Sequence, residues 1–407
     1  MTGMSEPENS GAGIKVSEGL RHAESHPAWH RYDEIPAEIL HDPETIFLNL
    51  SGGWQQVPSH IRQAGLNAVE EGYLKIQPVP EFNRAVADKF RNDFSVEIDA
   101  ASEVIPCHGA GEGLFAVLSI LLNPGDEVIT FDPGYTLSYL IPAYLGATVR
   151  TIPLAGNSGW SADADNVEAH LDRLLSPRTR AFILVNPDNP TGHVFRRDLL
   201  SRMGQRLRQH GVVIVEDQVY EKVIYPPHRF ISMMTLPDMR DHTVCVSSFA
   251  KSYLCAGMKV GYIAGPAEII GALRHYYMLG SFTPNTTALR AGIDILRGPQ
   301  GFLNQWIGQW DELRQKTTAA LNGIPGVSCN LPEAGTYCLA DISRLGTGEQ
   351  IAEVLMERAR VLVTPGNYYG PSGDQYIRVC YGRTKPEKVE QGLERIVAAL
   401  QALKPGN

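Results

Sequence analysis

Short hydrophobic runs alternate with amphipathic stretches through the middle of the chain. The runs AFILVN (181–186) and VVIVED (212–217) are aliphatic and rich in β-branched residues, which predicts buried strands. The stretch between them, Arg196–Gly211, has the spacing of a helix that packs on one side. Connections of this length are crossovers between parallel strands, so we expect an α/β protein with helices on both faces of a mostly parallel sheet.

The same patterning extends toward the N-terminus. Residues 46–50 (IFLNL) predict a short strand, and an amphipathic helix from Pro80 carries Phe82, Val86 and Phe90 on one face. The strand is followed by Ser-Gly-Gly-Trp (51–54). Its adjacent glycines can bring backbone N–H groups close to a ligand, or they only make a turn. Both readings stay open, and Gly53 and Trp54 are candidates for substrate binding.

Four chemically suggestive features follow predicted strands. They are the Gly-Ala-Gly loop at 109–111, Asn189, Asp217 and Lys251. The glycine loop leads into a predicted helix, whose free N–H groups and positive dipole end can hold an anion. Singly, each feature has an ordinary structural explanation. Because ligands bind outside the carboxyl ends of parallel strands, their common position favours one site.

Lys251 lies in the stretch SSFAKSYLCAGMKVGY (247–262), just past the predicted strand VCVSS. A lysine at a strand end, among small and apolar residues, is a candidate for a depressed pKa and amine chemistry. The ordinary alternative is a side chain that extends into solvent. A second cation, Lys259, follows between Gly257 and Gly261.

Composition narrows the class of protein. The 407 residues are 43% hydrophobic and 20% charged, which is typical of a globular protein of two or three domains. The net charge of −9 argues against a nucleic-acid partner. We find no membrane-spanning run, no signal peptide and no metal-binding pattern, and the six cysteines are scattered, so a cytoplasmic protein is expected. The polar, glycine-rich start predicts a flexible tail over residues 1–30.

The converging residues can each serve one aromatic phosphate cofactor that carries an aldehyde. Lys251 would form a Schiff base with the aldehyde, and Asp217 would keep a pyridine nitrogen protonated. The remaining candidates would hold the ring and the phosphate. These are Tyr220 and Asn189 for a phenolic oxygen, Tyr135 for the ring face, and Gly109, Ala110, Gly111, Ser248 and Lys259 for the phosphate.

The chain resembles the fold-type I pyridoxal-phosphate (PLP) enzymes, within them the class I/II branch of the aspartate aminotransferase superfamily. The resemblance rests on motifs that occur in the family's order and with its spacings, over nearly all of the chain after about residue 45. They are NPDNPTG (186–192), EDQVY (216–220), SFAK (248–251) through Gly261-Tyr262, YIRV (376–379), and Tyr73 followed by PEF (80–82).

The resemblance implies roles for individual residues. Lys251 resembles the lysine that binds the cofactor and moves the substrate Cα proton. Arg378 resembles the arginine that grips the α-carboxylate, with Asn189 assisting. Tyr73 resembles a tyrosine that reaches the cofactor phosphate of a neighbouring subunit, which implies a homodimer with shared sites.

The resemblance also implies the domain plan. A three-layer αβα large domain, with a mostly parallel sheet, would span residues 61–290. A smaller α+β domain would combine residues 31–60 with 291–407.

The chain departs from the family pattern in several places. Lys259 stands where most relatives have arginine, and Ala250 replaces a usual serine. Pro78 replaces a usual glycine, and the substrate loop is Ser-Gly-Gly-Trp-Gln-Gln (51–56). Two functions therefore remain: an aminotransferase that passes the amine of an amino acid to a 2-oxo acid, or a PLP enzyme of specialised metabolism. The second would carry out β/γ-elimination, replacement or cyclisation on an amino acid or an S-adenosylmethionine-like substrate.

Overall fold

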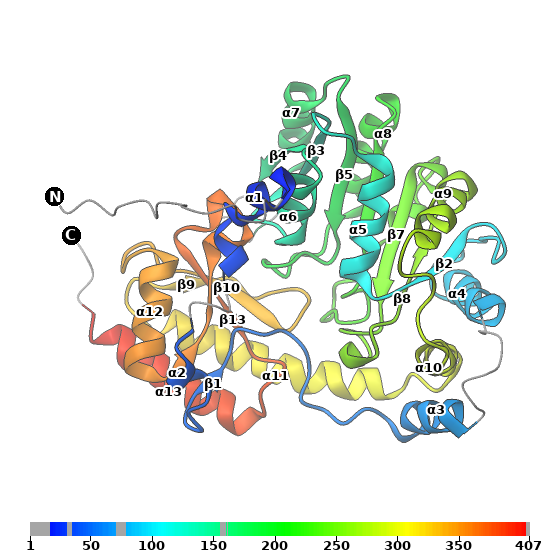
Figure 1. Ribbon diagram of the computed structural model, residues 1–407. Helices are drawn as coiled ribbons and strands as arrows, with labels where there is room; N and C mark the ends of the chain where they lie inside the picture. The colour runs from blue at the N-terminus through cyan, green and yellow to red at the C-terminus, as the bar shows by residue number, and fades with distance from the viewer. Residues whose placement is uncertain (1–16, 31–34, 71–78, 155–159, 161, 404–407) are drawn as a thin grey trace, which may run out of the picture.

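A seven-stranded sheet forms the centre of the larger part of the molecule (Figure 1). The structure is a computed structural model and describes residues 17–30, 35–70, 79–154, 160 and 162–403. In the order in which they lie side by side, the strands are β2 (Val104–Cys107), β8 (Gly261–Ala264), β7 (Thr243–Ser248), β6 (Val213–Asp217), β5 (Thr179–Val185), β3 (Glu127–Asp132) and β4 (Thr148–Pro153).

The sheet is mostly parallel, which confirms the predicted fold class. Strands β4, β3, β5, β6 and β7 pair in parallel, whereas β8 runs antiparallel to both β7 and β2. Sequence patterning did not anticipate β8. It follows β7 after a short loop that holds Lys251, too short for a crossover. Gly261 permits the pairing, because a Cβ there would lie 2.3 Å from the carbonyl oxygen of Ser247.

Helices cover both faces of this sheet, as the crossover lengths predicted. The alternation of side chains along β5 shows why. Phe182 and Leu184 pack toward one helical layer, and Ile183 packs toward the other. The first layer contains α7 (Ala164–Leu174) and α8 (Arg197–Gln209), and the second contains α5 (Ala110–Leu121), α6 (Leu137–Tyr144) and α9 (Ala267–Met278).

A second, four-stranded antiparallel sheet lies in the smaller part. Its order is β12 (Thr364–Pro365), β13 (Tyr376–Cys380), β10 (Tyr337–Asp341) and β9 (Ser328–Cys329). Helices α11 (Phe302–Asn322), α12 (Gly348–Ala359) and α13 (Pro386–Gln401) pack beside it, and α11 runs across the lower part of the view in Figure 1 toward α10. The bounds of the two domains stay predictions.

The N-terminal segment joins the smaller part. Its strand β1 (Ile46–Phe47) pairs in parallel with β11 (Val361–Leu362), and it is shorter than the predicted 46–50. Helix α2 (Ala37–Leu40) precedes it. Helices α3 (Ser59–Glu70), α4 (Val79–Phe94) and α10 (Thr286–Arg297) then pack together. In α4 the predicted apolar face is confirmed, because Phe82, Val86 and Phe90 are all buried.

Part of the stretch predicted as a flexible tail forms a helix. Helix α1 (Glu18–Glu24) is capped by Ser17 and packs against α6. The packing is close, since a Cβ at Gly19 would lie 2.0 Å from the carbonyl oxygen of Tyr144. Ala23 and Ala28 are buried, and Ala28 contacts a small aromatic cluster. Small residues such as Gly19, Ala23 and Ala28 fit a closely packed interface, but they give the sequence little hydrophobic pattern.

Two observations on the described residues concern membrane spans and metal sites. None of their helices is both long enough and apolar enough to cross a bilayer. Nor do they contain a group of three or more His, Cys, Asp or Glu side chains placed to hold a metal ion. All six cysteines are buried free thiols, as expected for scattered cysteines.

Candidate active site

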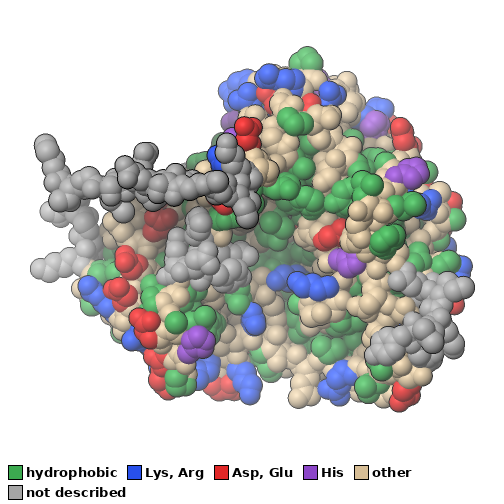
Figure 2. Space-filling model, viewed as in Figure 1, with side chains coloured by type: hydrophobic (Ala, Val, Ile, Leu, Met, Phe, Trp, Pro, Cys, Tyr) green, Lys and Arg blue, Asp and Glu red, His purple; other side chains and the backbone are tan. Residues whose placement is uncertain are grey.

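A cavity of about 960 Å³ is lined by residues of both sheets. The large sheet contributes residues at or just after the carboxyl ends of β5, β6 and β7, together with the loop before α5. The small sheet contributes β12 and β13, and the N-terminal segment contributes Asn49–Ser51. Figure 2 looks onto a face that is hollowed near its middle, where hydrophobic, basic and acidic side chains meet.

Lys251 lies in this cavity with its amine held by the N-terminal segment. Its Nζ donates to the carbonyl oxygen of Ser51 at 3.0 Å and to the Ser51 Oγ at 2.9 Å. The hydroxyl of Tyr220 donates to the same Oγ at 2.8 Å. Burial, and next the guanidinium of Arg378, lowers the pKa of Lys251 to about 8. The depressed pKa expected from the sequence is confirmed.

Asp217 ends β6 and is buried. Its Oδ1 accepts a hydrogen bond from the backbone N–H of Val219 at 3.0 Å. Burial raises the pKa of Asp217 to about 7, while this hydrogen bond and the charge of Lys251 act in the opposite direction. A nearby positive group would lower the pKa of this carboxyl group and so favour the ionised carboxylate.

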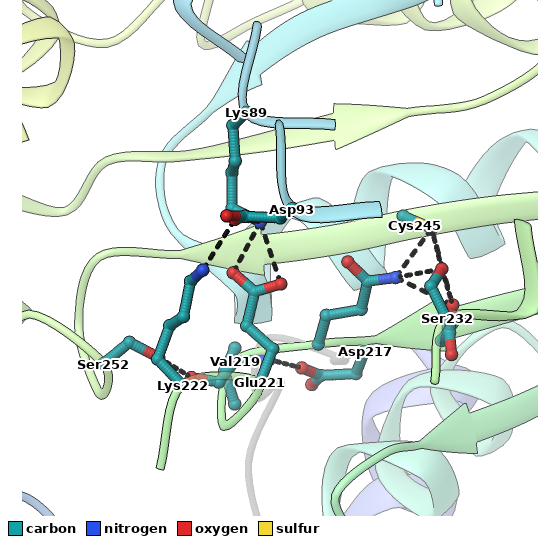
Figure 3. A network of polar contacts seen from close by, with 11 residues as sticks. Lys89, Asp93, Asp217, Val219, Glu221, Lys222, Ser232, Cys245 and Ser252 are labelled. Carbon is teal, nitrogen blue, oxygen red and sulfur yellow. Dashed lines mark hydrogen bonds and ion pairs between the residues drawn. The ribbon is translucent and has the colours of Figure 1, made fainter. Parts of the chain in front are cut away.

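Two buried polar networks flank Asp217 (Figure 3). On one side the carboxylate of Glu216 accepts from Gln218 at 2.8 Å and from Ser232 at 2.9 Å, and Cys245 lies beside them. On the other side lies an ion-pair network that reaches α4. In it Lys89 Nζ pairs with Glu221 at 2.8 Å and with Asp93 at 3.2 Å, and Asp93 also pairs with Lys222.

These networks hold the loop that carries the site. Residues of both belong to 216–222, the stretch that contains Asp217 and Tyr220. The hydroxyl of Ser252 donates to the carbonyl oxygen of Val219 at 2.9 Å, which ties the Lys251 loop to the same stretch. Each member is buried or half-buried and makes at least one hydrogen bond or ion pair, so the networks restrain the relative position of Lys251 and Asp217.

Arg378 comes from the middle of β13 and is buried. Its guanidinium donates to Asn189 Oδ1 at 2.9 Å and to the carbonyl oxygen of Asn49 at 2.9 Å. It lies over the rings of Tyr337 and Tyr369, with ring centroids at 5.3 Å and 4.8 Å. The guanidinium is therefore held in one orientation.

The Gly-Ala-Gly loop at 109–111 and Ser248, at the end of β7, also line the site. Helix α5 begins after Gly109, which has φ +91° and gives no side-chain cap to the first N–H groups. Those groups belong to Ala110 and Gly111, and both residues line the cavity. Ser248 and the exposed Lys259 also line it. The loop thus presents backbone donors and a cation to an anion.

Most of the residues predicted from the sequence meet in this cavity. Those that line it are Gly109, Ala110, Gly111, Tyr135, Asn189, Asp217, Tyr220, Ser248, Lys251, Lys259 and Arg378. Tyr73 lies outside the described residues. The roles of these residues remain predictions.

Gly53 and Trp54 do not line the cavity, and their part in substrate binding stays a prediction. A Cβ at Gly53 would meet Leu254 at 2.5 Å, and Gln55 donates to Gln309 of α11 at 3.1 Å. The backbone N–H of Gly52 donates to the Oγ1 of Thr336 at 3.3 Å.

Several lining residues were missed by sequence reasoning. Ser51, which holds Lys251, immediately precedes the glycine pair, and that pair was the one signal for it. Arg383 lies five residues beyond Arg378 and carries no motif of its own. Glu349 and Glu353 lie one turn apart on α12 and line the same cavity, a spacing that on its own indicates only a solvated helix face.

Comparison with known proteins gives a consistent result. Residues 49–396 match the family model described as aminotransferase class I and II. The chain is 30% identical to an aspartate aminotransferase of Rhizobium meliloti (strain 1021) over 365 residues, which is 85% of this chain and 86% of the relative. It is also 30% identical to a probable aspartate/prephenate aminotransferase of Thermus aquaticus, over 84% of this chain and 88% of that one.

A solved structure agrees. The aspartate aminotransferase from Rhizobium meliloti superimposes with a TM-score of 0.82 at 27% identity, over 98% of this chain and 100% of that chain.

Proposed function

The chain belongs to the class I and II aminotransferases, and from that premise we propose that the cavity around Lys251 transfers the amine of an amino acid to a 2-oxo acid. Aminotransferases of this family use PLP. The observation that carries the proposal is a half-buried lysine of lowered pKa that shares one cavity with Asp217 and Arg378. The curated relatives described above are named aminotransferases, which favours transamination over elimination, replacement or cyclisation.

The residues present fit an aromatic aldehyde phosphate. The uncapped N–H groups at the start of α5 can donate hydrogen bonds to a phosphate. The amine of Lys251, whose pKa is lowered, is more often neutral than an ordinary lysine and can react with an aldehyde. When bound, PLP supplies an electron sink that weakens the Cα–H bond of the substrate. The residues assigned to it here are Lys251, Asp217, Tyr220, Asn189, Tyr135, Gly109, Ala110, Gly111, Ser248 and Lys259, with Tyr73 proposed from the sequence alone.

Lys251 is the proton carrier in this proposal. With a pKa of about 8, roughly one amine in ten is neutral at pH 7, compared with fewer than about one in a thousand for an ordinary lysine. A neutral amine can accept the Cα proton and return it elsewhere. Ser51 holds the Nζ from the side of the N-terminal segment, so the amine is oriented before substrate arrives.

In this proposal Asp217 holds the cofactor and Arg378 holds the substrate. Asp217 is the group that would hold the ring nitrogen protonated, since a buried carboxyl beside a positive nitrogen ionises readily. Arg378 is the group that would bind the α-carboxylate, through donors that Asn189 and Asn49 already orient. Tyr220 links the two sides through its hydrogen bond to Ser51.

We also propose a homodimer in the cytoplasm. Large apolar side chains are exposed together at the end of α9 and just after it: Met278 is 69% exposed, Leu279 87% and Phe282 64%. A patch of this kind favours a contact with a second copy. Light scattering should give the mass of two chains, and Leu279→Asp should lower it toward one. Leu331→Asp, at another exposed leucine, is the matched control.

The experiment that tests the function is an absorbance titration of the purified protein loaded with PLP. Single amino acids are added without any 2-oxo acid. A donor should convert the lysine-bound cofactor band stoichiometrically to the amine form, and 2-oxoglutarate or pyruvate should restore it. A product that forms while the cofactor band stays unchanged would instead indicate elimination, replacement or cyclisation.

A further inference from the structure

Glu216 is a buried acidic residue that the proposed reaction does not use. It stands one position before Asp217 on β6 and is fully buried. Asp217 lines the cavity around Lys251, whereas Glu216 does not. Successive residues of a strand point to opposite faces of the sheet, so the side chain of Glu216 lies behind β6, on the face away from Asp217. It therefore does not touch a cofactor or a substrate in this cavity.

Hydrogen-bond donors surround the carboxylate of Glu216. They are Gln218 Nε2 at 2.8 Å, Ser232 Oγ at 2.9 Å, the backbone N–H of Met233 at 3.1 Å, Asn186 Nδ2 at 3.5 Å and Cys245 Sγ at 3.5 Å. Two of these donors, Ser232 and Cys245, are labelled to the right of Asp217 in Figure 3. Because each of these groups donates to the carboxylate, the arrangement favours its ionised form.

The surroundings of Asp217 are different. Within the described part of the chain, only the backbone N–H of Val219 donates to its carboxyl group, at 3.0 Å. Burial raises the pKa of both Glu216 and Asp217 to about 7, and the charge of Glu216 adds to the rise at Asp217. Two adjacent buried carboxyl groups with different partners are typical of sites where proton affinity is tuned.

A negative charge at Glu216 acts on Asp217 through the interior of the protein. Charges interact over longer distances there than in water, because water and salt screen them less. A carboxylate behind β6 raises the affinity for a proton both of Asp217 and of a nitrogen placed beside Asp217. The network of donors keeps this charge in one place.

We propose that Glu216 is a positioning residue that acts through Asp217: its negative charge makes the Asp217 site hold a proton more firmly. The inference rests on the proposed function, in which Asp217 keeps the ring nitrogen of PLP protonated. A proton between Asp217 and that nitrogen is then retained more strongly, and the ring keeps its positive charge. Glu216 thereby supports the electron-withdrawing state of the ring without contact with it.

The first test is an absorbance titration of the PLP-loaded protein against pH, without substrate. In Glu216→Gln the pKa of the lysine-bound cofactor should fall by about half a unit or more, because a nearby negative charge is lost. Adding Gln218→Glu to that variant returns a carboxylate to the network and should restore most of the pKa. Ser232→Ala keeps the acid but removes one donor, and should lower the pKa by a smaller amount.

The control for this titration is Glu357→Gln, at an exposed glutamate of α12 that does not line the cavity. It should leave the pKa of the cofactor unchanged. An unchanged pKa in Glu216→Gln would overturn the inference. If that variant does not fold, an unchanged pKa in Ser232→Ala would overturn it.

The second test asks whether Glu216 acts through Asp217. Glu216→Gln should lower kcat about 3- to 10-fold and change KM for the amino acid less than about twofold. In a chain that already carries Asp217→Asn, the same change should lower kcat by less than about 1.5-fold, because the group through which it acts is absent. Equal losses in both chains would show that Glu216 only supports the fold, and would overturn the inference.

The outcomes separate the inference from the proposed function. A protein that transaminates, with the same cofactor pKa in Glu216→Gln as in the wild type, keeps the proposed function and overturns the role of Glu216. A protein that binds PLP but transaminates no amino acid refutes the proposed function, and the cofactor pKa then decides the role of Glu216. A protein that forms no lysine-bound cofactor refutes both.

Discussion

The two walls of the cavity are built in different ways. The wall from the large sheet places Asp217, Ser248 and Lys251 at the ends of consecutive strands or in the loops that follow. The wall from the small sheet takes Arg378 from mid-strand, and it takes Ser51 and Arg383 from loops more than 300 residues apart in the chain. The two walls meet at the hydrogen bonds between Lys251 and Ser51.

In the proposed function the two walls serve different steps. The large-sheet wall carries the groups that would act on the cofactor, and buried networks on both sides hold them. The small-sheet wall carries Arg378, whose guanidinium is held by Asn189 and Asn49, and the exposed Arg383. We expect changes in the first wall to lower the rate of the chemical step, and changes in the second wall to weaken substrate binding.

The largest effect is expected from Lys251→Ala. Turnover should fall by about 10⁴-fold or more, because the amine both attaches the cofactor and carries the proton. Borohydride reduction followed by mass spectrometry should find no cofactor attached to the chain. Lys316→Ala, at an exposed lysine of α11, should keep the attachment and the rate. Full activity without Lys251 would rule out the assignment.

Next in size is Asp217→Asn, which keeps the shape and removes the charge. We expect kcat to fall about 100- to 1000-fold, with a much smaller loss of cofactor affinity, since the carboxylate stabilises charge on the ring. Stopped-flow kinetics and cofactor titration measure the two quantities separately. Asp241→Asn, at an exposed aspartate, is the control. A near wild-type rate would show that another group protonates the ring.

Arg378→Lys tests the second wall. Lysine keeps the charge but cannot bind Asn189, Asn49 and a carboxylate in one plane. The kcat/KM should fall about 10- to 100-fold for acidic and neutral amino acids alike, since every amino acid carries the α-carboxylate. A loss confined to acidic amino acids would show that Arg378 binds a side-chain carboxylate and not the α-carboxylate.

Ser51→Ala tests the contact between the walls. Its Oγ accepts from Lys251 and Tyr220, and loss of that acceptor disfavours the charged amine. The pKa of Lys251 should therefore fall further, and the pH–rate profile should move to lower pH with only a several-fold change in maximal rate. An unmoved profile would mean that the carbonyl oxygen of Ser51 alone holds the amine.

The smallest effect concerns stability without cofactor. Burial raises the pKa of Asp217 from 3.8 to about 7, so the folded state binds more protons than the unfolded state between these values. Stability from this group is present at low pH and is lost as pH rises toward 7. Asp217→Asn should therefore raise the melting temperature at pH 8 by about a few degrees and leave it nearly unchanged at pH 4. A gain that is equal at both pH values would contradict the raised pKa.

The sequence by itself determined the fold class and most of the large-sheet wall. Alternation along each strand and the lengths of the connections specify a mostly parallel sheet, and chain direction places the residues after parallel strands at one edge. Asp217, Asn189, Lys251 and the glycine loop could therefore be grouped without coordinates. Arg378 and Tyr73 came only from family motifs.

Tertiary structure alone decided the rest. The backbone N–H of Cys380 donates to Leu48 at 2.7 Å, and that of Gly52 donates to Thr336 at 3.3 Å, so long-range contacts lay the N-terminal segment along the small sheet. This packing brings Ser51 to Lys251 and Arg383 to the cavity. Such contacts join segments more than 280 residues apart. Hydrophobic periodicity predicts local secondary structure, but it does not predict which distant segments pack together.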